Sequence, residues 1–186
     1  MNSTHPIITI DLILDKLNTR DVLHGVLHSI LFHRLFGTVK PQTFEVLDVT
    51  MPGVSDTEME TLVEEKVAIF RKGIQNSPLK KGQIIVTFSE KRPRKSWFQV
   101  YMGDEEVPWE QWVINAEVRQ PRSENERQQA NGNLTATLTR SIETMLSHTT
   151  SERGRNAVPQ ITTAAGISPF PLRITVKVGG IDVEGT

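Results

Sequence analysis

Three histidines lie close together in the chain and are the side chains best suited to hold a metal ion. His24 and His28 are four residues apart, which places them on one face of a helix, and His33 follows. A zinc enzyme would also need a third ligand and a general base, and the segment lacks the glutamate of the H-E-x-x-H pattern. We therefore expect structural histidines beside a packed helix, with a pH-sensitive contact as the alternative. We predict no metal site and no cofactor.

Three adjacent acids, Asp104, Glu105 and Glu106, offer paired carboxylates for acid–base catalysis. No histidine or lysine accompanies them, so we interpret them as part of a solvated loop. The sequence also lacks the glycine patterns of nucleophile elbows, dinucleotide sites and phosphate loops, and it contains no cysteine. We predict that the protein is not an enzyme and has no catalytic residue. A small hydrolase remains an alternative, because catalytic triads assemble only in space.

The aromatic residues give the clearest indication of a binding site. All three tryptophans and the only tyrosine lie between residues 95 and 112. Trp97 and Phe98 follow a basic run and precede Gly103 and the acidic residues, which is the composition of a loop. Large aromatic side chains on loops are a common means of holding another protein. We predict that Trp97 and Phe98 form an exposed docking site, with burial in the protein's own core as the alternative.

The basic run, residues 91–95, resembles a nuclear-import or nucleic-acid patch. It is short and contains a proline, and the 186-residue chain has a net charge of −1. No global field therefore favours nucleic acid or an acidic membrane surface. We expect the run to be a solvated base for the aromatic loop that can attract an acidic partner, and we predict no binding to nucleic acid.

Pro108, Trp109 and Trp112 open a strand predicted over residues 107–118. The two tryptophans are three residues apart, on opposite sides of a strand, so at least one should enter the core. We expect these three residues to act as a structural anchor for the aromatic loop.

The elements that position these residues follow from periodicity. Alternating apolar residues predict strands over residues 7–14, 44–49, 83–89, 107–118 and 172–178. Helical spacing predicts helices over residues 20–36, from Ser55 and from Ser123, the last two at capping-box patterns. Residues 149–169 contain few large apolar side chains, and we expect a long mobile connection there.

This order of elements predicts an α+β or α/β sandwich, with one mixed or antiparallel sheet covered by three helices on one face. The length favours a single domain over residues 1–186. No apolar stretch approaches the ~20 residues of a membrane span. Because no basic region precedes an apolar run at the N-terminus, we expect a cytoplasmic protein.

Several segments, taken in order, resemble the autophagy-related protein 101 family. They are residues 26–37, the helix from Ser55, the basic run with Trp97 and Phe98, residues 107–112, and residues 171–178. The resemblance covers most of the chain except 149–169. It implies an α+β fold of the HORMA-like sandwich type, with one mostly antiparallel sheet. The helices around His28 and from Glu58 are then candidates for a dimer face.

The resemblance also implies a function. Members of this family are adaptors that pair with the HORMA domain of autophagy-related protein 13 and stabilise it. They belong to the autophagy-initiation kinase complex at the phagophore assembly site. A protruding "WF finger" recruits downstream autophagy factors, and Trp97 and Phe98 match it, although some relatives have a proline between the two rings. A peptide-capturing HORMA adaptor of the checkpoint or DNA-repair type is the alternative, and the short segment after Val178 argues against it.

Overall fold

The computed structural model describes residues 5–95, 98, 101–163 and 166–183. Its strands are β1 (Ile7–Leu14), β2 (Pro41–Val46), β3 (Val49–Val54), β4 (Lys81–Lys95), β5 (Tyr101–Val118), β6 (Leu172–Val178) and β7 (Ile181–Asp182). Its helices are α1 (Thr19–Arg34), α2 (Thr57–Asn76), α3 (Glu124–Thr150) and α4 (Glu152–Ala157). None of the described helices is long and apolar enough to cross a membrane.

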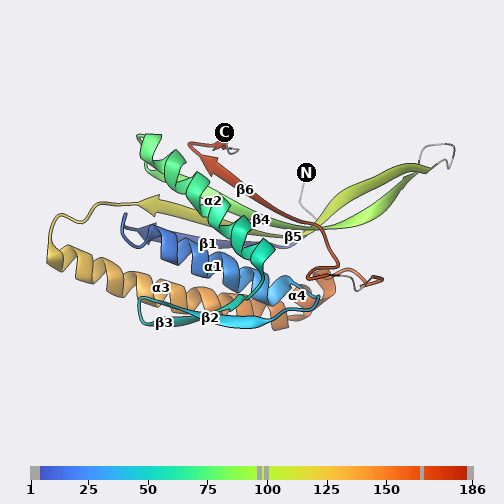
Figure 1. The fold of residues 1–186 in the computed structure, drawn as a ribbon, viewed down its shortest axis with the longest axis horizontal. Helices are drawn as coiled ribbons and strands as arrows, with labels where there is room; N and C mark the ends of the chain where they lie inside the picture. Colours follow the sequence, from blue (N-terminus) through green and yellow to red (C-terminus); the bar gives the residue numbers. More distant parts are fainter. Residues whose placement is uncertain (1–4, 96–97, 99–100, 164–165, 184–186) are drawn as a thin grey trace.

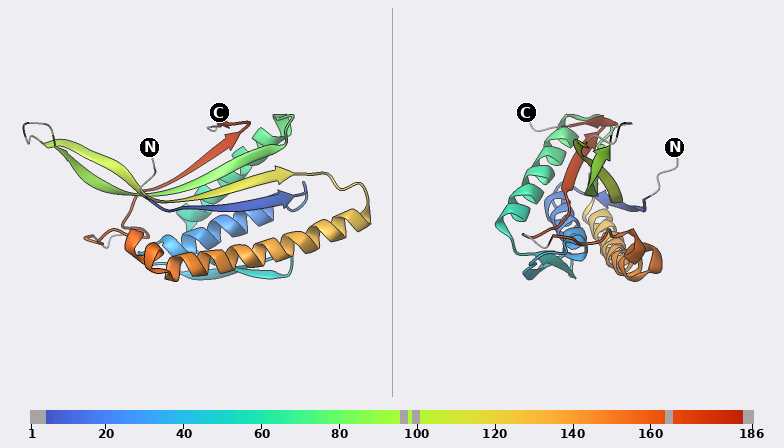
Figure 2. Two further views of the ribbon diagram at one scale, coloured as in Figure 1. Left: turned by 180° about the vertical axis from the view of Figure 1, so that it is seen from behind. Right: turned by 90° about the vertical axis from the view of Figure 1, so that its right-hand side faces the viewer.

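Five of the strands form one sheet in the order β1-β5-β4-β6-β7. Only the β1–β5 pair is parallel, and the other neighbours are antiparallel. The three long helices lie on one face of this sheet, with α1 between α2 and α3, and the β2–β3 hairpin covers α1 from outside (Figures 1 and 2). The predicted α+β class, with one mostly antiparallel sheet, is confirmed and is consistent with a HORMA-like fold.

Helix α1 is the centre of the core. Of its 16 residues, 12 are buried, including both His24 and His28. A Cβ atom added at Gly25 would lie 3.0 Å from the sulfur of Met51, so this glycine allows β3 to approach closely. Within α1, Arg20 and Asp21 are exposed near its start, and Phe32 and His33 are partly exposed near its end. The expectation that the helix around His28 or the helix from Glu58 supplies a dimer face stays a prediction.

The β2–β3 hairpin replaces the single strand expected over residues 44–49. Leu47 and Asp48 have positive φ angles of 48° and 62°, the backbone of a two-residue type I′ turn. This turn type normally uses asparagine and glycine, so the sequence carries no recognisable turn signal here.

The helix ends correct two further expectations. Asp56, not Ser55, caps α2, because its carboxylate accepts a hydrogen bond from the Met59 amide at 3.0 Å. Ser123 caps α3 as predicted, accepting from the Glu126 amide at 3.2 Å. Helices α3 and α4 then occupy the first part of the expected connection over 149–169, and irregular chain begins only after Ala157.

Candidate functional site

A two-stranded arm projects from one end of the sheet (Figures 1 and 2). We call residues 89–95 of β4 and 101–108 of β5 the arm. Pairing of β4 with β6 stops at Phe88, and pairing of β5 with β1 stops at Gln111, so neither neighbouring strand accompanies the arm. At ~3.3 Å per residue, seven residues of β4 carry the tip roughly 20 Å beyond the sheet.

Opposite charges face each other across the arm. The register places Lys91 opposite Glu106 and Arg92 opposite Glu105, while Asp104 stands opposite the uncharged Pro93. Such cross-strand pairs stabilise a hairpin that has no core beneath it. The expectation of a loop over residues 91–95 is therefore wrong, because this run is a strand. Lys91 and Arg92 have acids opposite them in the register, and Arg92 forms an ion pair with Glu90 on its own strand, so the run is not an isolated patch of positive charge.

Exposed apolar side chains gather toward the tip of this polar arm. Phe98 is 81% exposed, Tyr101 64% and Met102 63%. Trp97, the other residue of the predicted docking pair, lies outside the described residues. The Tyr101 hydroxyl donates to Asp104 at 2.9 Å, and this hydrogen bond raises the pKa of the phenol. Gly103 between them has a φ of +95°, which only glycine adopts readily.

A β-bulge anchors the arm to the sheet. Phe88 pairs with Glu110 and Ser89 pairs with Pro108, so Trp109 is the extra residue. The bulge resets the alternation of sides, and Trp109 and Glu110 are both buried although adjacent. Trp112 is fully buried and Pro108 is half-buried. Both tryptophans therefore enter the core, where simple alternation required only one.

Trp109 packs in an aromatic cluster at the base of the arm. Its ring centroid lies 5.5 Å from that of Phe88, 5.4 Å from Phe170 and 6.4 Å from Phe36. The guanidinium of Arg34 stands 5.6 Å from the Trp109 ring centre. The cluster joins the arm to the end of α1 and to the segment before β6.

A buried polar centre lies beside this cluster, consisting of Arg34, Glu110, Trp112 and His148. Arg34 binds Glu110 through two hydrogen bonds, Nε to Oε1 at 2.8 Å and Nη2 to Oε2 at 2.6 Å. The Trp112 indole N–H donates to Glu110 at 2.6 Å, and Nε2 of His148 lies 2.8 Å from the same carboxylate. Arg34 also donates to the Gly154 carbonyl at 3.0 Å. The centre thus joins α1, β5, α3 and α4.

Sequence reasoning missed this centre. Arg34 falls on the apolar stripe of α1, which is the one signal that it requires a buried acidic partner. Glu110 lies beside Trp109 at the bulge, and nothing local to it indicates a buried carboxylate.

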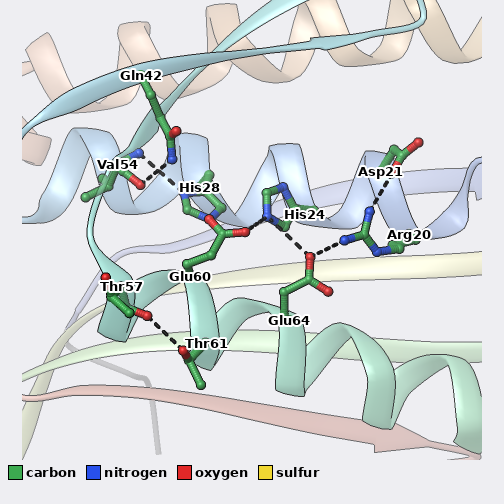
Figure 3. A network of polar contacts seen from close by, with 10 residues as sticks. All are labelled: Arg20, Asp21, His24, His28, Gln42, Val54, Thr57, Glu60, Thr61 and Glu64. Atoms are coloured by element: carbon green, nitrogen blue, oxygen red, sulfur yellow. Dashed lines mark hydrogen bonds and ion pairs between the residues drawn. The ribbon is translucent and has the colours of Figure 1, made fainter.

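His24 and His28 form a second, partly buried network between α1 and α2 (Figure 3). Glu60 of α2 lies between them, with Oε1 at 2.7 Å from Nε2 of His24 and Oε2 at 3.1 Å from Nε2 of His28. Glu64, one turn further along α2, lies 3.7 Å from His24 and pairs with Arg20. His33 is apart from this network, because its ring bonds to the Ser29 carbonyl.

His28 is held in its neutral form. The Val54 amide donates to its Nδ1 at 3.3 Å, so the ring proton resides on Nε2, facing Glu60. The pKa of His28 is lowered to about 4, mainly by burial and secondly by the neighbouring His24, while Glu60 partly opposes both.

The donor set of His24, His28 and Glu60 could be mistaken for a metal site, because its ligand atoms lie within 4.8 Å of one another. A metal ion on Nε2 of His28 would require the ring proton to move to Nδ1. The Val54 N–H already points at that atom, and two donors cannot face each other there. The geometry suits a hydrogen-bonded link between two helices.

Comparison with known proteins gives one consistent result. The sequence profile of the family "Autophagy-related protein 101" matches residues 11–165. Proteins of that name are 36% identical in Schizosaccharomyces pombe (60% of this chain, 59% of the relative) and 36% identical in Arabidopsis thaliana (60% and 52%). The Xenopus laevis protein is 29% identical (58% and 55%). The match thus spans little more than half the length of these curated relatives.

Proposed function

This chain belongs to the autophagy-related protein 101 family, and from that premise we propose that it is a non-catalytic adaptor of autophagy initiation. In this proposal it forms a HORMA–HORMA heterodimer with autophagy-related protein 13 and stabilises that partner. It acts in the cytoplasm, within the autophagy-initiation kinase complex at the phagophore assembly site. Trp97 and Phe98 recruit downstream autophagy factors, and Pro108, Trp109 and Trp112 anchor the arm that carries them.

The exposure of Phe98 carries the proposal. A phenylalanine that is 81% exposed at the end of an arm leaves apolar surface in water that a partner can cover. At ~25 cal/mol per Å², burying two large rings yields several kcal/mol before ordering costs are subtracted. That is enough for the hot spot of a recruitment site.

The construction of the arm also supports an adaptor. The two strands of the arm are polar and carry acids opposite Lys91 and Arg92, so the arm gives little nonspecific attraction. The base is buried, and its polar contacts join β5 to three helices of the fold. A fixed base and an exposed aromatic tip suit the capture of another protein.

The hydrolase alternative lacks support among the described residues. His24, His28 and His148 each face a carboxylate, and no serine or threonine hydroxyl hydrogen-bonds to any of these three rings. A hydroxyl nucleophile requires such a base within reach.

Two measurements test the proposal separately. Light scattering coupled to size exclusion should show a one-to-one complex with the HORMA domain of autophagy-related protein 13. A well-folded chain that forms no complex would refute the heterodimer.

The second measurement addresses the tip. Trp97→Ala with Phe98→Ala should preserve the melting temperature and the heterodimer, and abolish recruitment of downstream factors in cells lacking the endogenous protein. Leu146→Ala is the matched control, because Leu146 is an exposed apolar residue on α3 and is not part of the arm. Unfolding of the double variant would show instead that the rings belong to the core.

A further inference from the structure

A cationic pocket lies at the end of the sheet opposite the arm. There β5 ends, α1 begins and α2 ends (Figure 1). The pocket has a volume of about 380 Å³, within the range of small-ligand sites. Its charged lining residues are Lys16, Arg71, Lys80 and Arg119, and no acidic residue of the described chain is among its lining.

The four cations differ in how they are held. Lys80 donates to the Ile74 and Gln75 carbonyls at 3.0 and 2.9 Å, which fixes its ammonium group at the end of α2. Arg119 donates to Glu117 at 2.8 Å, an acid that also faces Lys81. Lys16 and Arg71 form no hydrogen bond or ion pair with the described part of the chain. Two positive charges at this pocket are therefore free to bind an anion.

Two exposed leucines lie in the turns next to the pocket, although neither lines it. Leu17 is 74% exposed in the turn between β1 and α1, and Leu79 is 66% exposed in the turn between α2 and β4. Each is the chain neighbour of a pocket cation, Lys16 or Lys80. Both turns lie at the end away from the arm (Figures 1 and 2). Single exposed leucines are ordinary, but two beside one cationic pocket form an amphipathic end.

We propose that this end of the molecule docks on a membrane surface by binding the phosphate-bearing headgroup of an anionic lipid. The cations of the pocket contact the headgroup phosphate, while Leu17 and Leu79 enter the interfacial layer. The leucines favour a lipid over a soluble phosphate, which would leave them in water. Because the net charge of the chain is −1, the attraction is local to this end.

The proposal does not depend on the arm. With this end on a membrane, the arm points away from the lipid and its tip stays free (Figure 1). One molecule can therefore contact a membrane and a protein partner at the same time.

Vesicle co-sedimentation tests the proposal with the full chain. Vesicles of phosphatidylcholine containing phosphatidylinositol monophosphate should bind the protein, and phosphatidylcholine alone should not. Lys16→Ala with Arg71→Ala should weaken binding roughly 25-fold, at about fivefold for each lost charge. Leu17→Ser with Leu79→Ser should also weaken it. Lys40→Ala with Arg153→Ala is the charge-matched control, since neither residue lines the pocket, and should bind as the wild type does.

Each contrary result has a definite meaning when circular dichroism shows a folded protein. Absence of vesicle binding overturns the proposal. Unchanged binding by the Lys16/Arg71 variant overturns the pocket assignment. Calorimetric binding of the soluble inositol phosphate headgroup without vesicle binding overturns the membrane assignment. Phe98→Ala should bind vesicles normally, which separates this test from that of the proposed function.

Discussion

The arm and the polar centre at its base use the same chemistry in opposite surroundings. Both set cations against carboxylates. In the polar centre Arg34 is 2% exposed and Glu110 is fully buried, and each is bonded on several sides. In the arm, Lys91 and Arg92 stand opposite Glu106 and Glu105 in the register, and all four residues are exposed to water. Burial makes the loss of one partner expensive, whereas solvent screens the exposed pairs.

This difference in burial gives the two parts of one continuous strand, β5, separate roles. At its base, β5 is held by buried contacts whose loss would destabilise the fold. Along the arm, the paired charges favour a defined register and solubility without adding much to global stability. A substitution at the tip can therefore change partner binding while the fold is unaffected.

The largest expected effect comes from breaking the polar centre. Arg34→Met leaves Glu110 buried without its cation and should lower the free energy of unfolding by about 3–5 kcal/mol. Urea denaturation measures this. Arg92→Met on the arm, the exposed counterpart, should cost less than about 1 kcal/mol. Equal losses in the two variants would show that burial does not distinguish the regions.

A double variant sharpens this result. In Arg34→Met with Glu110→Met, no charge remains buried without its partner. It should therefore be more stable than Arg34→Met alone. A double variant with the summed loss of both single variants would argue against coupling between the two groups.

Low pH should lower the free energy of unfolding because His28 becomes protonated. Its pKa is lowered to about 4 in the folded protein from 6.5 in the unfolded chain, so below pH 6.5 the unfolded chain binds the proton first. The contribution of His28 is complete above pH 6.5 and declines as the pH falls towards 4, by about 3 kcal/mol in total. His28→Asn should flatten the pH dependence of unfolding between these values. His33→Asn, outside the network, should not, and an unchanged slope in His28→Asn would refute the assignment.

The smallest effect is expected along the arm. Lys91→Glu places like charges opposite each other at Glu106 and should cost about 0.2–1 kcal/mol. Amide hydrogen exchange of the arm measures the local loss. The exchanged pair, Lys91→Glu with Glu106→Lys, should restore part of the protection, because it also removes the ion pair of Glu106 with Arg173. A pair that remains as weak as the single variant would show that the cross-strand charges do not interact.

What the sequence could predict was local. The alternation over 172–178 and the cap at Ser123 are readable from neighbouring residues, and both are present in the structure. The arm was missed because charged residues are uncommon in strands, and their partners lie across the hairpin. The bulge at Trp109 likewise depends on pairing with Phe88 and Ser89, which periodicity cannot reveal.

The candidate sites follow the same rule. Trp97 and Phe98 could be proposed from composition alone, because they stand out in one short window. The cationic pocket could not be predicted, because its four charged residues come from separate segments. The net charge of −1 gives no sign of them. Glu60 could not be predicted as the partner of His24 and His28 either, since only the packing of α2 on α1 brings the three residues together.

The two strands of the arm pair only with each other, so the number of residues in them sets the length of the arm. The reach of the tip is fixed by how many residue pairs separate it from the bulge at Trp109. Removing two residues from each strand would shorten that reach by about 7 Å and leave every side chain on its present face. Removing one residue from each strand would move every side chain beyond the deletion to the opposite face of the arm. In the proposed function, the spacing between this protein and a partner at the tip can thus change in steps of two residues, without any change to the domain behind the arm.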